Sequence, residues 1–337
     1  MSYTDQSLLN VLTREGVLIN ASVRYWRGCK KLRPEDIGLN PDDLSDRLIS
    51  LGHKRLLSKD ALADLSLVEG RAHSLIETNT FPFLNGLGHF LPNGKLQEVT
   101  DALKRLETDF WQAREKFLAS YRQHREQAMS EWRQMADRFT PDPDRLLSAI
   151  EAAFPNPTAM EKFYGFDTTT FQITVPESLH VDLITLADQQ NVVQARQQAA
   201  REAGAKIRND TQQFVAECVA SLREQTAVLC HEMLDSINSN KVGVHQKTLN
   251  RLVNFIDQFK AMNFANDTVM ESQLEAVRKE LLTRTAGEYR DSDHARQQLV
   301  NGLNKLAGKA RELARADATE LVNRFGQLGK RKFNLAA

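Results

Sequence analysis

The sequence predicts a mainly α protein: a mixed α+β N-terminal domain with a small sheet, followed by an elongated, antiparallel, coiled-coil-like helical arm. Three observations support this fold class. Apolar residues recur at helical spacing over most of the chain, while residues 17–26 and 163–175 are instead rich in alternating, β-branched or aromatic residues. The longest helical pattern, residues 176–237, has no break. We therefore expect a compact domain at 1–175 and an arm of about three helices at 176–337.

The pattern over residues 176–237 predicts one long helix with a continuous buried stripe. Apolar and small residues recur there every eleven positions, and a repeat of eleven, about 3.67 residues per turn, keeps a stripe nearly straight along a helix. A stripe this long needs partner helices lying along it. The three series are Ile207, Cys218 and Leu229; Thr211, Leu222 and Met233; and Val215, Thr226 and Ile237.

The N-terminal half predicts alternating helices and strands. A short helix at 4–15 precedes the strand at 17–26, and regular structure stops between Gly28 and Gly38. Gly52 suits a helix end or tight turn, and the glycine- and proline-rich residues 78–95 are too apolar for a solvated linker, which predicts a packed loop. Helices are predicted at 42–50, at 58–77 with Ser58 as N-cap, and at 95–138 with Met135 on the buried side.

Prolines divide the second half of this domain. Pro141 and Pro143 end the helix at 95–138, and a short helix is predicted at 144–154. Residues 163–175 predict a hairpin or an irregular pair of strands. Since isolated strands leave unpaired edges, we expect these strands and residues 17–26 to share one sheet. Pro176 then begins the long helix at a position that tolerates proline.

The arm is completed by two later helical patterns. One covers residues 246–262, and the last begins at an Asp267 or Thr268 cap and runs to residue 328, with a polar stretch at 285–297 where it can bend. Three antiparallel helices would bury each stripe, and the arm also leaves oligomerisation open.

Composition excludes several classes of protein. Lys+Arg and Asp+Glu number 44 each, so no global charge indicates a nucleic-acid or membrane binder. The polar N-terminus and the lack of a long apolar run favour a cytoplasmic protein without membrane partners. Cys29, Cys218 and Cys230 form no CxxC pair, so we expect reduced thiols.

No pattern of catalytic or metal-binding residues emerges. Gly86, Gly88, Gly94 and Lys95 lack phosphate-loop spacing, and Leu96 stands where a magnesium-binding hydroxyl is required. The eight histidines show no ligand spacing, and adjacent side chains such as those at 230–232 diverge on a helix. We expect a protein that is not an enzyme, with no cofactor and no metal.

Two basic stretches are candidate interaction sites. The first combines Trp26 with cations, which suits base stacking and phosphate neutralisation, although a solvated strand edge explains it as well. The second is the C-terminal tail, where helix-dipole stabilisation is the alternative to binding an acidic partner or nucleic acid. The residues are Arg24, Arg27, Lys30 and Lys31 around Trp26, and Lys330, Arg331 and Lys332 in the tail.

Several segments resemble family 3150 of the bacterial domains of unknown function, over roughly residues 15–240. They are INASVRYWRGCKKLRPEDIG, LGHKRLLSKDAL, NGLGHFLP before a long helix, and FYGFD. His53 stands where most members carry a small residue. The most specific positions, which add Lys54 and Arg55 to the interaction candidates, are Trp26, Lys30, Lys31, Leu32, Gly52, Lys54 and Arg55.

The resemblance implies genomic context rather than chemistry. Such proteins are encoded on phage, plasmid and integrative elements beside a MoxR-type AAA+ ATPase and a von Willebrand factor A protein, and the family offers no catalytic residues. We therefore expect a non-enzymatic accessory protein, acting as adaptor or client of that ATPase. The alternative is a nucleic-acid-binding protein of a mobile element, acting in replication, recombination or anti-phage defence.

Overall fold

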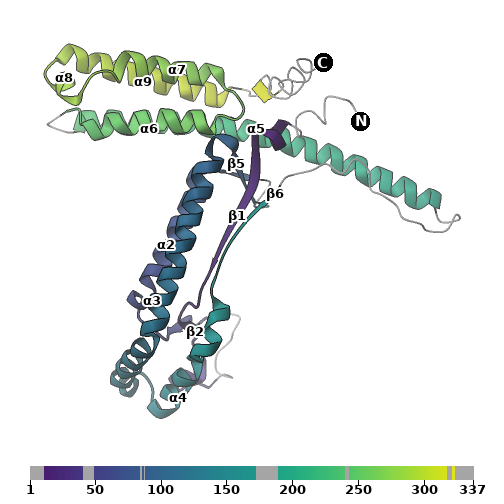
Figure 1. Ribbon diagram of the computed structural model, residues 1–337, viewed down its shortest axis with the longest axis vertical. Helices are drawn as coiled ribbons and strands as arrows, with labels where there is room; N and C mark the ends of the chain where they lie inside the picture. The colour runs from purple at the N-terminus through teal and green to yellow at the C-terminus, as the bar shows by residue number, and fades with distance from the viewer. Residues whose placement is uncertain are drawn as a thin grey trace. The chain divides into compact units, whose positions relative to one another are not determined.

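The computed structural model describes residues 11–40, 49–83, 86, 88–171, 189–239, 243–316 and 321–322. It confirms a mainly helical fold with a small antiparallel sheet in the N-terminal region, followed by long helices (Figure 1). The predicted helix at 42–50 and the predicted domain boundary at Pro176 lie outside these residues, apart from positions 49 and 50.

The described residues form two compact units that interleave along the sequence. Unit 1 draws on Met1–Ile19, Asn79–Gln97 and Thr170–Ala337, and unit 2 on Asn20–Thr78 and Glu98–Thr169. Strands β1 (Gly16–Arg24) and β6 (Gly165–Phe171) and helix α3 (Asn93–Phe139) each continue from one unit into the other. Each unit therefore contains segments that are distant in sequence.

Unit 1 is built on the predicted long helix. Helix α5 (Gln189–Ser239) packs against α9 (Asp293–Arg315), while α6 (Gln246–Met262) and α7 (Thr268–Leu281) complete the bundle. Figure 1 shows α6, α7 and α9 alongside one another. The predicted bounds of α6 and the Asp267 cap of α7 are confirmed.

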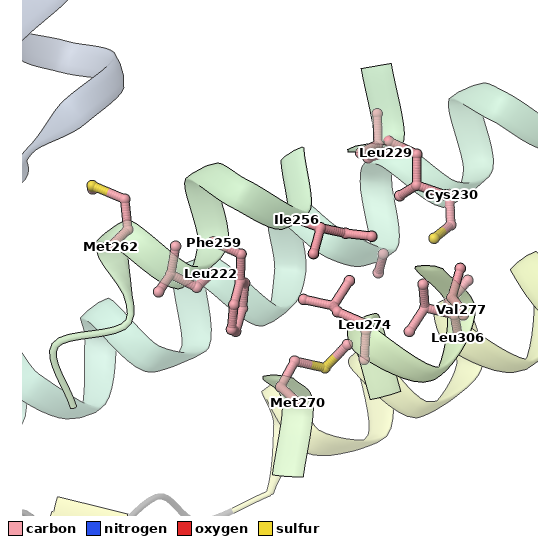
Figure 2. Packing of buried hydrophobic residues seen from close by; sticks show 14 of the residues in the cluster. Leu222, Leu229, Cys230, Ile256, Phe259, Met262, Met270, Leu274, Val277 and Leu306 are labelled. Atoms are coloured by element: carbon pink, nitrogen blue, oxygen red, sulfur yellow. The ribbon is translucent and has the colours of Figure 1, made fainter. Parts of the chain in front are cut away.

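The eleven-residue stripe of α5 is confirmed. Of its nine residues, Ile207 is half-buried and the others are buried. Figure 2 shows how Leu222, Leu229 and Cys230 meet residues of α6, α7 and α9 in one apolar cluster. The stripe is broader than predicted because Phe214, Val219 and Leu234 beside it are buried too.

A buried charge lies within this apolar bundle. Arg223 of α5 donates from Nε to Oδ2 of Asp267 at 2.6 Å, and the two side chains are 7% and 2% exposed. A second guanidinium nitrogen donates to the carbonyl oxygen of Leu313 at 2.7 Å, while Asp267 Oδ1 caps α7 by accepting from the Met270 amide. One cation thus connects α5, α7 and α9.

The last predicted helix is instead two helices joined by a short one. Helix α8 (Ala286–Arg290) separates α7 from α9. The reason is local capping: Thr285 and Glu288 form a capping box, and Ser292 accepts from the Ala295 amide to begin α9. These two new helix N-termini let the chain change direction between α7 and α9. Tyr289 of α8 is fully buried.

The packed loop predicted at 78–95 contains a hairpin. Strands β4 (Phe81–Phe83) and β5 (Gly88–Pro92) pair in antiparallel fashion, with Phe81 opposite Phe90. The hairpin belongs to the core of unit 1: Phe83 lies 4.8 Å, centroid to centroid, from Phe214 of α5, and Phe90 lies 4.8 Å from Phe264. The sequence predicted a loop because these strands of three and five residues themselves contain Pro82, Gly88 and Pro92, residues that are typical of loops.

The sheet has the order β4-β5-β1-β6, so β1 is joined to β6 as predicted. Gly16 of β1 lies opposite Pro92 of β5. The hairpin or irregular strand pair predicted at 163–175 is wrong over residues 165–171, where β6 runs as one strand without a turn; residues 172–175 lie outside the described residues.

Unit 2 packs its helices around aromatic side chains. The helix predicted at 58–77 begins later, with the 3₁₀ turn η3 (Asp60–Leu62) before α2 (Ala63–Asn79), whereas α3 and α4 (Pro143–Ala153) closely match the prediction. Phe110, Phe117 and Tyr121 lie buried along α3. Met135 is exposed rather than buried, because Ala136 continues the Ala128 face about two turns further along the helix.

A second, two-stranded sheet was not predicted. Strand β2 (Cys29–Lys31) lies where regular structure was expected to stop, and it pairs with β3 (His53–Arg55). Gly52 has a left-handed φ of 74°, as the predicted tight turn requires, and its carbonyl accepts from the Leu32 amide at 3.0 Å. The 3₁₀ turn η1 (Pro34–Ile37) follows β2, and η5 (Pro157–Phe163) precedes β6.

Replacing Asp267 with alanine should strongly destabilise the helical bundle. The change leaves the Arg223 guanidinium buried without its carboxylate, which typically costs roughly 3–5 kcal/mol. The control, Asp257→Ala, removes an exposed carboxylate from its pair with Arg278 and should cost at most about 1 kcal/mol. Urea unfolding followed by far-UV circular dichroism measures both, and equal losses would contradict a stabilising role for the buried pair.

A fragment ending at residue 175 tests the predicted domain. It retains β4 and β5 but lacks Phe214 and Phe264, so we expect exposed phenylalanines, dye binding and aggregation. The full chain is the reference. A soluble fragment that unfolds cooperatively without binding dye would show that residues 1–175 fold independently.

Candidate functional site

The β2–β3 hairpin orders the first group of candidate residues. In an antiparallel pair, directly opposed residues share a face and successive residues alternate. Cys29 lies opposite Arg55 and Lys31 opposite His53, so these four share one face, whereas Lys30 and Lys54 occupy the other. The sequence alone did not predict this division because it did not predict the strands.

Lys54 is a structural residue. Its side chain is buried, and its ammonium lies 2.7 Å from Oδ2 of Asp36, which is buried as well. The same carboxylate oxygen accepts from the Arg33 amide at 2.8 Å. Lys54 therefore attaches η1 to the hairpin, and its charge is already neutralised.

Arg27 forms a paired cluster with α2. Its guanidinium donates to both carboxylate oxygens of Glu69, at 2.6 and 2.5 Å, and lies over the Tyr25 ring. The hydrogen bonds from Arg27 lower the pKa of Glu69, and those to Glu69 raise the pKa of Arg27. Burial raises the pKa of Tyr25, whose hydroxyl donates to Glu69. The cluster is thus a neutralised ion pair.

Trp26 and Arg24 are also engaged within unit 2. The Trp26 ring is 8% exposed and lies among Phe117, Tyr121 and Phe154, with centroid distances of 6.4, 5.9 and 6.2 Å. This packing is that of a core residue and leaves little ring surface for stacking a base. Arg24 pairs with Asp167 of β6 at 2.8 Å in an exposed salt bridge.

A groove of about 890 Å³ lies between the hairpin and α2. We call it the cationic groove. It brings the candidates Arg27 and Arg55 together with two cations that the sequence did not single out. Its lining residues are Tyr25, Arg27, Cys29, Arg55, Leu57, Ser58, Lys59, Asp60, Leu62, Ala63, Ser66, Leu67, Gly70, Arg71 and Ser74.

Arg55, Lys59 and Arg71 are exposed, and none has an ion pair within the described part of the chain. Asp60 is the one carboxylate among the described lining residues. The sequence contained a pattern that points to Arg71: residues 63, 66, 67, 70, 71 and 74 have the spacing of one face of a helix. The groove can bind an anion through free cations and serine hydroxyls.

Cys29 is half-buried and lines the groove, whereas Cys218 and Cys230 are buried. Burial raises the pKa of both buried thiols, that of Cys230 to about 12, which favours their protonated form. Within the described ranges, no group of three or more histidine, cysteine, aspartate or glutamate residues could hold a metal ion. Lys330, Arg331 and Lys332 lie outside the described residues.

Comparison with protein families identifies the family of this chain. The family described as "Protein of unknown function (DUF3150)" matches residues 13–286, a span that includes the cationic groove, both hairpins and all of α7. The chain belongs to this family. The resemblance predicted from the segments around Trp26, Lys30 and Lys54 is thereby confirmed at the level of the family.

Two further comparisons give no match, neither among curated proteins nor among solved structures. Among the helices that the structure describes, none is long and apolar enough to cross a membrane.

The Arg27–Glu69 pair predicts a pH-dependent contribution to stability. Because the pKa of Glu69 is lowered in the folded state, the contribution is fully present above the unfolded-state pKa of 4.5 and is lost as the pH falls through the folded value. We therefore expect the difference in unfolding midpoint between the wild type and Glu69→Gln to be constant near neutral pH and to shrink below about pH 4.5.

Tryptophan fluorescence during urea unfolding measures this difference, since Trp26, Trp111 and Trp132 all lie in unit 2. Glu77→Gln on the same helix is the control, because Glu77 is exposed and has no salt bridge within the described residues. A Glu69→Gln difference that persists at pH 3 would contradict the assignment.

Proposed function

We propose that this protein is a non-enzymatic, cytoplasmic accessory protein, an adaptor or client, of a MoxR-type AAA+ ATPase and a von Willebrand factor A protein on a phage or integrative element. The family resemblance suggests the partners. The observation that supports a protein-binding role is a second groove, between α5 and α6 of unit 1, with an exposed aliphatic side chain beside it.

This groove, the α5–α6 groove, has a volume of about 920 Å³. Its walls are two helices whose inner faces belong to the apolar core, and Arg251 of α6 forms a salt bridge with Glu232 of α5 across it. Both walls are therefore held in place before any partner binds. The lining residues are Ser221, Glu224, Gln225, Val228, Leu229, Glu232, Gln246, Lys247, Asn250, Arg251, Asn254, Phe255 and Gln258.

Val228 distinguishes the groove from ordinary helix surface. Its side chain is 49% exposed although it lies on the helix that forms the core of unit 1, and Phe255 nearby on α6 is half-buried. An apolar anchor surrounded by amides and charges is the typical composition of a protein interface, with an apolar centre and a polar rim.

Replacing Val228 with aspartate should weaken association with the neighbouring ATPase by at least about tenfold, because a charge at the centre of an interface is desolvated without a partner. The measurement is co-purification followed by titration of purified ATPase against the variant. Val269→Asp is the matched control, since Val269 is 44% exposed on α7 and does not line the groove.

Both variants should keep the wild-type circular dichroism spectrum, because each side chain is largely solvent-exposed. Equal affinities of the two variants for the ATPase would reject the α5–α6 groove as the docking surface. A wild-type protein that does not bind the ATPase would reject the adaptor function.

The cationic groove favours a second function, in nucleic-acid binding for replication, recombination or defence of a mobile element. Its supporting observation is the cluster of unpaired cations Arg55, Lys59 and Arg71. The two functions use separate surfaces, one in each unit, and so can be tested separately.

A further inference from the structure

We propose that the phosphate backbone of single-stranded nucleic acid binds along one continuous track in unit 2. The track consists of Lys31, His53 and Arg55 on one face of the β2–β3 hairpin, continued by Lys59 and Arg71 in the cationic groove. This inference rests on the second proposed function and assigns its site.

The strand register of the β2–β3 hairpin determines which of its residues belong to the track. Cys29 and Arg55 are opposed residues, and both line the groove, so the hairpin face that they share faces the groove. Lys31 and His53 lie two residues further along the same two strands and hence on the same face. Lys31 thereby extends the cationic lining beyond the groove itself, and the His53 imidazole adds a hydrogen-bonding group beside it. Lys30 and Lys54, on the other face, do not line it.

Pairing separates the cations of this region into two groups. Arg24, Arg27 and Lys54 are neutralised by Asp167, Glu69 and Asp36. By contrast, Lys30, Lys31, Arg55, Lys59 and Arg71 are exposed and have no carboxylate partner within the described residues, and of these Lys30 lies on the hairpin face away from the groove. Lining a groove with like charges costs free energy in the free protein, and a bound anion would relieve that repulsion.

The distribution of the charges favours a polyanion over a single phosphate. The cations come from β2, β3, the segment before η3, and α2, and the groove that three of them line has a volume of about 890 Å³, more than one phosphate group fills. A nucleic-acid backbone supplies successive charges along such a track, and neutralising them releases condensed counterions.

The apolar residues of the groove favour a single strand over a duplex. Leu67, an exposed leucine, lines it and supplies most of this apolar surface, whereas Leu57 and Leu62, which also line it, are buried. Unstacked bases of a single strand can cover this apolar surface, whereas a duplex keeps its base faces stacked inside. The buried Trp26 ring offers little stacking surface, so we expect backbone-dominated binding with little sequence preference.

The test is fluorescence anisotropy of a labelled oligothymidylate of about 20 nucleotides titrated with the full chain, at salt concentrations from about 50 to 200 mM. Lys31→Ala should weaken binding about fivefold, and the combined Arg55→Ala, Lys59→Ala and Arg71→Ala variant should reduce the salt slope by about two, at roughly 0.7 per lost contact with a single strand. Lys31→Arg should restore affinity.

Lys30→Ala is the matched control. Lys30 carries the same charge as Lys31 on the same strand and is likewise exposed, but it lies on the opposite face, so its loss should leave the affinity nearly unchanged. Cys29 provides a second readout. It is the one cysteine of the three that is not buried, and a bound strand should slow its reaction with a maleimide.

Several results would overturn the site. Equal losses for Lys30→Ala and Lys31→Ala, an unprotected Cys29, or binding that disappears only when residues 327–337 are removed would each place the nucleic acid elsewhere, while the second proposed function would stand. Competition by a matched duplex or by polyglutamate as strong as that of the oligonucleotide would reject single-strand binding. No binding by the wild type at low salt would reject the site and the second function together.

Discussion

The buried guanidinium of Arg223 is the constraint on which the helical bundle depends. Desolvating a charge is costly, and the cost is offset here by a carboxylate at 2.6 Å and a carbonyl oxygen at 2.7 Å. Asp267 begins α7 and Leu313 lies near the end of α9, so the hydrogen bonds form only when both helices have one register against α5. Apolar packing alone tolerates sliding and repacking far better than a buried ion pair does.

A second constraint is the close approach of two backbones, that of the start of α3, directly after the β4–β5 hairpin, and that of the end of α6. Gly94, at the start of α3, lies so near the backbone of Ala261 that a Cβ there would be 2.4 Å from the carbonyl oxygen. A residue with a side chain would push the start of α3 away from the end of α6. Together with the contacts of Phe83 and Phe90, this approach makes residues 79–97 part of the same core as the C-terminal helices.

The basic residues of unit 2 include some that form ion pairs within the fold and others that remain available to a ligand. The same short stretch of sequence contains Arg27, which is bound to Glu69, and Lys31, which is exposed on the groove-facing side of a strand. Residue type and spacing do not distinguish the two. The difference arises because α2 and η1 place carboxylates beside some cations and not beside others. A cation that is already paired and partly desolvated has little interaction left to offer a ligand.

The sequence by itself determined helices α3, α4 and α6 and the buried stripe of α5. Eleven-residue spacing and helical amphipathicity are local properties, and they correctly placed α3, α4 and α6, the Asp267 cap and the buried residues from Thr211 to Ile237. The strand pairing of β1 with β6 also followed, since an isolated strand is unstable. Motifs around Trp26 and Lys54 were sufficient to indicate the family.

Tertiary structure decided which residues lie together. Strands of three residues, such as β2, β3 and β4, carry too few positions for a period to be visible, and they are stabilised by pairing, β2 with β3 and β4 with β5. The burial of Trp26 by Phe117, Tyr121 and Phe154 likewise depends on packing between segments far apart in the chain, and the grouping of Arg55 with Lys59 and Arg71 depends on how β3 lies against α2. The sequence identified the basic residues of this region, but only the fold determined which of them form ion pairs. The carboxylate partners of Arg24, Arg27 and Lys54 lie between 18 and 143 positions away in the sequence, so local spacing does not reveal them.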